Sequence, residues 1–230
     1  MTETRHTVRL GSVAAGRVGP SRSRPPRSCP PRSRPPRDLV VRLAVPAELP
    51  AILTTVRAAF GYDLEARLVE RLEREGRVAV SMVADVGGGV GGHALLSCLG
   101  LSGGAGCANA AVPTNAAGCA RGPRTGPATD AVACPALALA PVAVAPGHQG
   151  RGIGSALVRA TLARADPALP VFVIGAPGFY QRFGFGPADG YGCACRFDVP
   201  LGHFMVLPAQ CPPAAFAARA VEYPAAFGGL

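Results

Sequence analysis

The chain has 230 residues, enough for one domain of ordinary size with tails, and its formal net charge is +9. Residues 1–37 hold nine Arg against one acid, a net charge of +8, whereas the remaining residues are nearly neutral at +1. A nucleic-acid partner is therefore not expected for the folded part. The uncharged run between residues 86 and 120 is interrupted by Gly, Ser, Asn and Pro, so no transmembrane helix and no membrane partner are predicted.

The N-terminal segment, residues 1–37, combines Arg with Ser and Pro and cannot bury enough apolar surface to fold. We expect it to be disordered. Three readings stay open: a solvated or artefactual tail, an organellar transit peptide, and an RNA-binding or phosphorylated tail. A cytoplasmic location is the default, and a chloroplast or mitochondrion is the alternative.

The eight cysteines contain no C-x-x-C pair, and no apolar secretory signal precedes them. We therefore expect free thiols in a reducing compartment rather than disulfides. Four cysteines in or beside a low-complexity segment could in principle hold a metal, but their wide spacing favours unpaired loop residues and no metal site is predicted. These four are Cys98, Cys107, Cys119 and Cys134.

The first half of the predicted domain begins with a strand at 39–45. Two amphipathic helices follow at 46–60 and 63–75, the second with Leu64, Leu68 and Leu72 four residues apart. Strands are then predicted at 78–86 and 92–99, joined by a glycine turn at 87–89.

The second half begins after residues 100–135, which show no periodicity and are interpreted as an inserted loop. The remaining elements are predicted as a strand at 136–145, a helix at 152–165, a strand at 171–174, a short helix at 177–183, and strands at 192–199 and 204–207. Together they predict an α/β domain over residues 38–230, with a single mixed central β-sheet flanked by helices.

The segment most informative about function is the predicted strand that enters a glycine-rich turn and opens a helix. It reads Val142-Ala143-Val144-Ala145-Pro146-Gly147-His148-Gln149-Gly150-Arg151-Gly152-Ile153-Gly154-Ser155. Unpaired N–H groups at a helix start, approached closely through glycines, form a cradle for an anion such as phosphate. No Lys-Ser/Thr follows the glycines, and Ser155 replaces the last glycine of G-x-G-x-x-G, so ATP and nicotinamide cofactors are disfavoured.

This segment resembles the Q-x-x-G-x-G pyrophosphate motif of the Gcn5-related N-acetyltransferases, the GNAT family. A second family motif, Y-x-x-x-G-F, follows at the expected distance as Tyr180-Gln181-Arg182-Phe183-Gly184-Phe185. Further segments are similar to the YhbS-type subfamily, and the resemblance covers about residues 38–99 and 136–228. These segments are Leu68-Val69-Glu70-Arg71-Leu72, Gly92-His93, Phe204-Met205-Val206-Leu207 and Tyr223-Pro224-Ala225-Ala226-Phe227.

The resemblance implies a GNAT fold, acetyl-CoA as co-substrate, no metal, and acyl transfer to a primary amine by direct attack in a ternary complex. It implies that the backbone of Val142, Ala143 and Val144 pairs with the pantetheine arm. It also implies that N–H groups of Gly150 to Ser155 hold the pyrophosphate, with Arg151 free to add charge, and that Tyr180 protonates the leaving thiolate. The acceptor would be a small molecule or a peptide, and the protein a monomer or homodimer.

Other readings remain open for these side chains. Tyr180 could pack with Phe179, Phe183 and Phe185 as an aromatic cluster, and Arg182 could either bind a phosphate or cap its helix. His93 is interpreted as a strand or core residue, His148 as a loop residue, and His203 is unassigned.

A general base is missing from the pattern, because residues 137–141 contain no acid. Deprotonation of the amine could fall to a water relay, to Glu65 or to Glu70. A non-catalytic acyl-CoA-binding protein of the same fold is therefore the alternative function.

Overall fold

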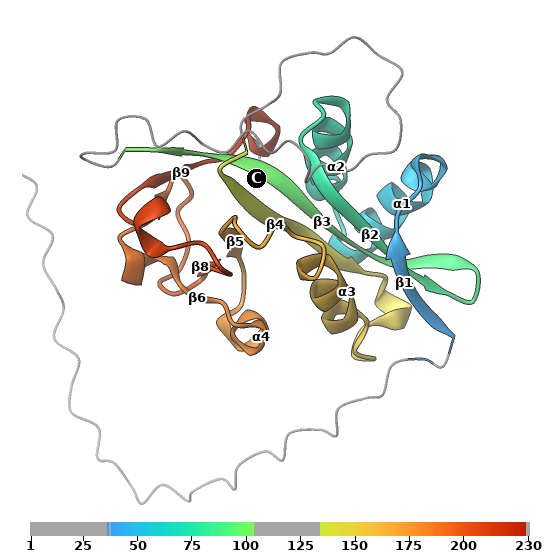
Figure 1. The fold of residues 1–230 in the computed structure, drawn as a ribbon. Helices are drawn as coiled ribbons and strands as arrows, with labels where there is room; N and C mark the ends of the chain where they lie inside the picture. Colours follow the sequence, from blue (N-terminus) through green and yellow to red (C-terminus); the bar gives the residue numbers. More distant parts are fainter. Residues whose placement is uncertain (1–35, 37, 104–133, 229–230) are drawn as a thin grey trace, which may run out of the picture. The chain divides into compact units, whose positions relative to one another are not determined.

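Apolar residues that alternate along the strands and form stripes on three helices build a mixed sheet with helices on both faces (Figure 1). The computed structural model describes residue 36, residues 38–103 and residues 134–228. The strands are β1 (Leu39–Leu43), β2 (Val78–Val86), β3 (Gly89–Ser102), β4 (Ala136–Val144), β5 (Val171–Ile174), β6 (Gly186–Pro187), β7 (Ala194–Cys195), β8 (Phe204–Leu207) and β9 (Ala220–Glu222). The helices are α1 (Leu49–Phe60), α2 (Leu64–Arg74), α3 (Ile153–Leu162) and α4 (Pro177–Tyr180), with short 3₁₀ turns that include η1 (Pro46–Glu48), η2 (Pro146–His148) and η3 (Gln181–Phe183).

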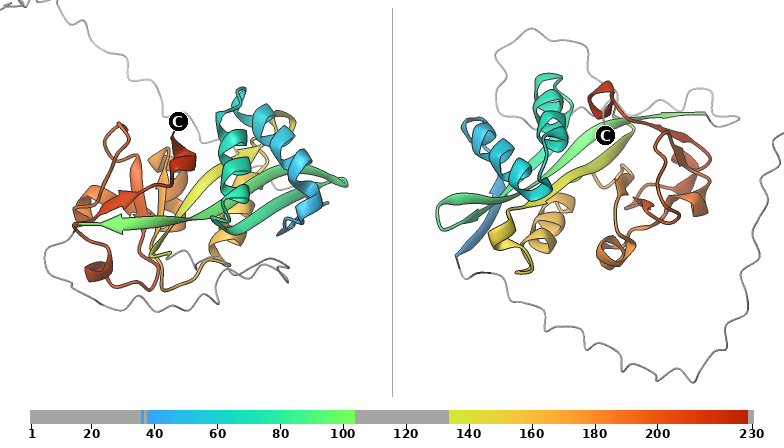
Figure 2. Two further views of the ribbon diagram at one scale, coloured as in Figure 1. Left: turned by 90° about the horizontal axis from the view of Figure 1, so that it is seen from above. Right: turned by 180° about the vertical axis from the view of Figure 1, so that it is seen from behind.

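The strands follow the order β1-β2-β3-β4-β5-β8-β6, and β9 pairs with both β3 and β7. The pairings along this order are antiparallel except for β4 and β5, which run parallel. The predicted single mixed sheet is confirmed. Figure 2 shows α1 and α2 on one face of the sheet and α3 on the other.

Two apolar clusters fill the two faces. The first includes Val56 of α1, Leu68 and Leu72 of α2, and Leu95 of β3. The second includes Leu157 of α3 with residues of β2, β3, β4 and β5. Successive side chains of a strand point to opposite faces, so β3 contributes to both clusters. Burial of one such Leu stabilises the fold by about 2 kcal/mol. Leu64, predicted on the apolar stripe of α2, lies at its start and is 42% exposed.

The predicted elements lie close to the observed ones, but several differ. The short strands β6 and β9 were not predicted, and the helix predicted at 177–183 divides into α4 and η3. The strand predicted at 192–199 reduces to β7, two residues long, which pairs only with the three-residue β9. The helix predicted at 152–165 ends at Leu162. The strand predicted at 92–99 extends to Ser102, because Gly100–Ser102 pair with β9. Residues 100–102, interpreted from the sequence as part of the inserted loop, therefore belong to β3.

The prediction of free thiols is wrong for two cysteines, because Cys98 and Cys134 form a disulfide with a Cα–Cα distance of 5.0 Å. Cys98 lies opposite Leu137 in the β3–β4 ladder, and Cys134 precedes β4 by two residues. Antiparallel pairing thus brings together two cysteines that are 36 residues apart in sequence. Among the described cysteines, Cys193, Cys195 and Cys211 are free.

Several predictions concern residues outside the described ranges. The disordered tail at 1–37 and most of the insert at 100–135 fall there, as do Cys107 and Cys119 of the suggested metal set. Within the described ranges, no three His, Cys, Asp or Glu side chains gather in a group that could hold a metal ion. No helix in these ranges has the length and apolar character needed to cross a membrane.

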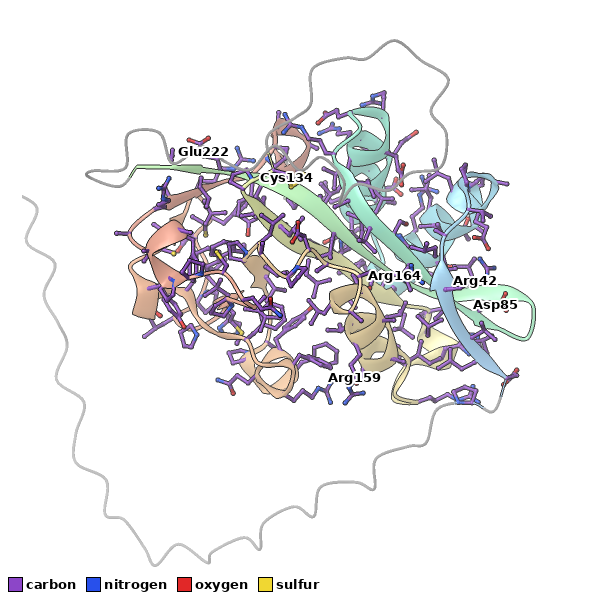
Figure 3. All side chains as sticks on the ribbon, in the orientation of Figure 1. Arg42, Asp85, Cys134, Arg159, Arg164 and Glu222 are labelled. Atoms are coloured by element: carbon purple, nitrogen blue, oxygen red, sulfur yellow. A yellow bond between two sulfur atoms is a disulfide. The ribbon has the colours of Figure 1, made fainter. Side chains whose placement is uncertain are left out.

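Arg42 of β1 joins three elements at one corner of the sheet. Its Nη2 lies 2.6 Å from Glu48 Oε1 and 3.3 Å from Asp85 Oδ2 (Figure 3). Glu48 also accepts the N–H of Val45 at 2.9 Å, and the Arg42 guanidinium lowers the pKa of this carboxyl group. Ion pairs at a surface contribute about 1 kcal/mol or less, so this group fixes the entry into α1 rather than the stability of the fold.

His93 is a polar residue inside the first core. Its side chain is 0% exposed, and its Nε2 shares a hydrogen bond of 3.0 Å with Ser81 Oγ of β2. Burial lowers its pKa from 6.5 to about 4, because the charged imidazolium is poorly solvated there. The prediction that His93 is a strand and core residue is confirmed.

We expect His93 to make the fold sensitive to acid. The unfolded chain binds the imidazole proton near pH 6.5 and the folded chain only near pH 4, so the unfolded state gains protons first as the pH falls. The contribution of the neutral imidazole to the free energy of unfolding is complete above pH 6.5. It is lost as the pH falls through 4, and the loss is at most about 3 kcal/mol. Urea unfolding at pH 7 and near pH 4 should show a larger loss for wild type than for His93→Leu. Equal losses would contradict this assignment.

Candidate functional site

The site is built around an incomplete pairing between the two parallel strands. β4 and β5 pair only at Leu137 with Val171 and at Ala138 with Phe172, although β4 continues to Val144. On its other side β4 stays paired with β3 to its end, with a register shift opposite Leu95. Within the described residues, the β5-facing backbone of β4 after Ala138 thus has no strand partner. An extended ligand can pair with such an edge as an added strand would.

The turn after β4 uses glycines in conformations that other residues rarely adopt. Gly150 has φ +74° and Gly152 φ +78°, and Gly152 is the N-cap of α3. The first backbone bond at this helix start runs from Ala156 N to Gly152 O. The N–H groups of residues 150–155 therefore have no backbone acceptor in the described part of the chain. The turn and the start of α3 present these donors together with the positive end of the helix dipole.

Gln149 links this cradle to the end of β4. Its side-chain Nε2 donates to Val144 O at 2.9 Å, which fixes the turn relative to the open strand edge. A Cβ atom at Gly154 would lie 3.6 Å from both Val144 Cγ2 and Phe179 Cζ, so Gly154 packs between the end of β4 and α4. Arg151 is exposed. Donors, glycines and an open strand edge together fit a phosphorylated ligand with an amide-containing arm, which is the chemistry of coenzyme A.

Tyr180 ends α4, which follows β5 on the far side of the opening. Its ring contacts Phe179 at 4.9 Å and Phe185 at 5.8 Å between centroids, both edge to face. Burial raises the pKa of Tyr180 to about 12. The phenol is therefore protonated at neutral pH, and its hydroxyl has no partner within the described residues, so it is free to donate a proton to a ligand.

Gly175 was not identified from the sequence and lies directly against Tyr180. A Cβ atom at this position would overlap Tyr180 Cε2 and approach Cδ2 to 3.1 Å. Gly175 N donates to His203 O at 2.9 Å, so the ring sits on a backbone held by the segment before β8. A glycine directly after a short apolar strand is the only sequence signal for this contact.

Arg182, for which a phosphate ligand and a helix cap were both considered, lies in η3 and binds a residue of the preceding helix α4. Its Nε donates to Phe179 O at 2.9 Å, and its guanidinium lies 4.1 Å from the Phe179 ring centroid. Arg159 of α3 contacts the same aromatic group. Its guanidinium carbon lies 5.5 Å from the centroid of the Phe183 ring, between α3 and α4 (Figure 3). The aromatic cluster is thus real, and Tyr180 belongs to it while keeping a free hydroxyl.

The carboxylates considered as bases lie on the other face of the sheet from Tyr180. Glu65 and Glu70 both belong to α2, which packs on the first core, whereas Tyr180 packs on the second. Glu70 is exposed, and Glu65 accepts a hydrogen bond from Tyr62 at 3.2 Å. The structure therefore does not bring either carboxylate together with Tyr180.

The other two histidines also differ in their surroundings. His148, predicted in a loop, belongs to η2, and its buried Nδ1 has no partner among the described residues. His203 Nδ1 shares a hydrogen bond with Leu201 O at 3.3 Å.

Residues 105–187 match the family model of the acetyltransferase (GNAT) domain. The chain is 25% identical over 171 residues to the N-acetyltransferase YhbS of Escherichia coli strain K12, covering 73% of this chain and 86% of that protein. It is 38% identical over 68 residues to the N-acetyltransferase YjhQ of the same strain, covering 28% and 38%.

Two solved structures share the fold over most of the chain. The crystal structure of YhbS from Escherichia coli in complex with CoA superposes with a TM-score of 0.65 at 24% identity, covering 85% of this chain and 95% of that chain. A GNAT family acetyltransferase from Brucella melitensis in complex with acetyl-CoA superposes with a TM-score of 0.56 at 25% identity, covering 82% and 97%.

Replacing Gly150 by Ala should weaken the anion cradle. A side chain at φ +74° costs about 1 kcal/mol or more and reorients the neighbouring N–H groups. We expect acetyl-CoA affinity, measured by isothermal titration, to fall roughly tenfold. Gly88→Ala is the matched control, because Gly88 has φ +85° and open space around it but lies in the β2–β3 turn. Equal weakening in both variants would show a general loss of stability instead.

Replacing Gly175 by Ala should displace the Tyr180 ring, because the added methyl group overlaps it. We expect a stability loss of about 1–3 kcal/mol and a lower rate of CoA release. Gly178→Ala in α4 is the control, since a Cβ atom there meets nothing within 4 Å. Thermal unfolding and thiol release measured together test the contact, and a wild-type rate in Gly175→Ala would refute it.

Proposed function

We propose that this chain transfers an acetyl or related acyl group from acyl-CoA to a primary amine, because residues 105–187 match the acetyltransferase (GNAT) domain model and the chain is similar to the YhbS N-acetyltransferases. We take residues 38–230 as the catalytic domain. The observation that supports the proposal best is the open β4 edge leading into the glycine turn at the start of α3.

In this proposal the substrate is held at two places. N–H groups of residues 150–155 bind the pyrophosphate, with Arg151 adding charge, while Gln149 keeps the turn against β4. The backbone of residues 142–144 pairs with the pantetheine arm, and one of its N–H groups polarises the thioester carbonyl. Coenzyme A supplies the thioester that makes the acyl group reactive.

Tyr180 acts as the general acid. Its phenolic proton goes to the sulfur that leaves when the amine nitrogen bonds to the acyl carbon, and the pKa of about 12 keeps this proton in place until the transfer. Direct attack by the amine requires no protein nucleophile, so the free cysteines have no role in the reaction. Holding both substrates together supplies much of the acceleration.

The test combines acetyl-CoA binding by isothermal titration with thiol release from a panel of primary amines: glycinamide, spermidine, tyramine and a tripeptide that begins with Ala. We expect the full-length protein to bind acetyl-CoA and to release CoA with at least one amine. Tyr180→Phe should keep the affinity and lower kcat by about a hundredfold or more.

Tyr191→Phe is the matched control, since Tyr191 packs on Phe216 in the first core, at 5.2 Å between centroids, and should keep the wild-type rate. Binding without CoA release from any amine would favour the alternative, an acyl-CoA-binding protein without catalysis. Absence of binding would refute the acyl-CoA site itself.

A further inference from the structure

His93 carries a polar atom that neither the fold nor the acyl-CoA cradle uses. The side chain is 0% exposed, and Nε2 is bonded to Ser81, but Nδ1 is buried and has no hydrogen-bond partner in the described part of the chain. Burying an unpaired polar atom costs about 1–3 kcal/mol. Such an atom in a folded protein calls for a water molecule or ligand beside it.

The alternation of β3 shows which face His93 occupies. A Cβ atom at the preceding Gly92 would lie 2.9 Å from Leu157 Cδ1 of α3, and the following Ala94 belongs to the same second core. His93 therefore points to the opposite face, which α1 and α2 cover. Its register partner on β4 is Ala143, and partners in a ladder share a face. Ala143 is itself buried in the first core, and its side chain is a single methyl group.

The bond to Ser81 sets the direction of the ring. The two nitrogen atoms of an imidazole point in widely divergent directions. Because Nε2 is turned toward Ser81 on β2, Nδ1 is turned away from β2, toward the side of β3 on which β4 lies; the open edge of β4 is its far edge, which faces β5.

We propose that His93 is a positioning residue of the acyl-transfer site, whose Nδ1 holds a water molecule on the α1-facing side of β4, and that this water receives the proton lost by the acceptor amine. The inference rests on the proposed function and supplies a route for the proton of the acceptor amine. Residues 137–141 of β4 carry no acid, and Glu65 and Glu70 belong to α2.

The proton transfers balance through this water. The amine nitrogen bonds to the thioester carbon, the carbon–sulfur bond breaks, and Tyr180 gives its proton to the sulfur. The surplus proton of the amine passes to the water and on to solvent, and solvent reprotonates Tyr180. Burial keeps His93 neutral, with a pKa of about 4, so Nδ1 orients the water by accepting its hydrogen bond rather than taking the proton itself.

Two substitutions separate this role from a structural one. His93→Asn places an amide atom close to the position of Nδ1 but is too short to reach Ser81, whereas His93→Gln reaches Ser81 and leaves the Nδ1 position empty. We expect His93→Gln to lower kcat roughly tenfold without changing acetyl-CoA affinity. His93→Asn should retain more of kcat although its Tm falls further. A purely structural His93 predicts the opposite order, with kcat following Tm.

Activity is measured as thiol release with the four panel amines. It is also measured with acetyl-CoA alone, because water is then the acceptor and must lose a proton in the same way. Thr161→Val is the control, because Thr161 Oγ1 is also buried and unpartnered but lies on α3 beside the second core. It should change Tm and leave kcat unaltered.

The outcomes distinguish the inference from the proposed function. If the wild-type protein turns over, the role of His93 is overturned by either of two results: His93→Gln has the wild-type kcat, or His93→Gln has a higher kcat than His93→Asn. Acyl transfer by the wild-type protein then still stands. A wild-type protein that releases no CoA with amine or water refutes the proposed function, and the inference falls with it.

Discussion

The separation of β4 from β5 after two residue pairs is the constraint on which the rest of the site depends. A strand edge inside a sheet is ordinarily satisfied by its neighbour, and leaving it open is costly unless something else pairs with it. Here the β5-facing edge beyond Ala138 leads straight into the glycine turn, so that one chain segment presents first unpaired backbone groups and then the N–H donors of a helix start. β5 in turn leads to α4, which puts Tyr180 on the other side of the opening. The position of each functional group follows from that single divergence.

The two faces of the sheet carry different parts of the proposed site. α3 and the aromatic group around Tyr180 share the second core, so the anion cradle and the proposed acid rest on one packed surface. α1 and α2 share the first core, which also encloses His93. The site is formed where the two faces meet at the open edge. Because cores are closely packed, small residues such as Ala143 and Gly175 decide how near a side chain from either face can come.

Local patterns predicted most of this arrangement. Helical spacing predicted α1 and α2, and the glycine turn after an apolar strand predicted the start of α3. The sequence could not predict features that depend on distant pairing: the extension of β3 through β9, the disulfide between Cys98 and Cys134, and the contact of Gly175 with Tyr180. β9 is three residues long and carries no periodic signal of its own, so only its partner makes it a strand. The roles assigned to residues 142–144 and 149–155 and to Tyr180 remain predictions for the experiments above.

The distant pairing of β3 also governs when the protein can fold as it is made. Val221, Tyr223, Ala226 and Phe227 belong to the first core together with residues of α2, and Arg71 of α2 donates to Gly228 O at 3.4 Å. The first core therefore stays incomplete while residues 220–228 are still inside the ribosome. Long-range contacts of this kind form late and leave apolar surface exposed in the meantime. A nascent chain of this protein therefore exposes part of its first core until residues 220–228 have been synthesised.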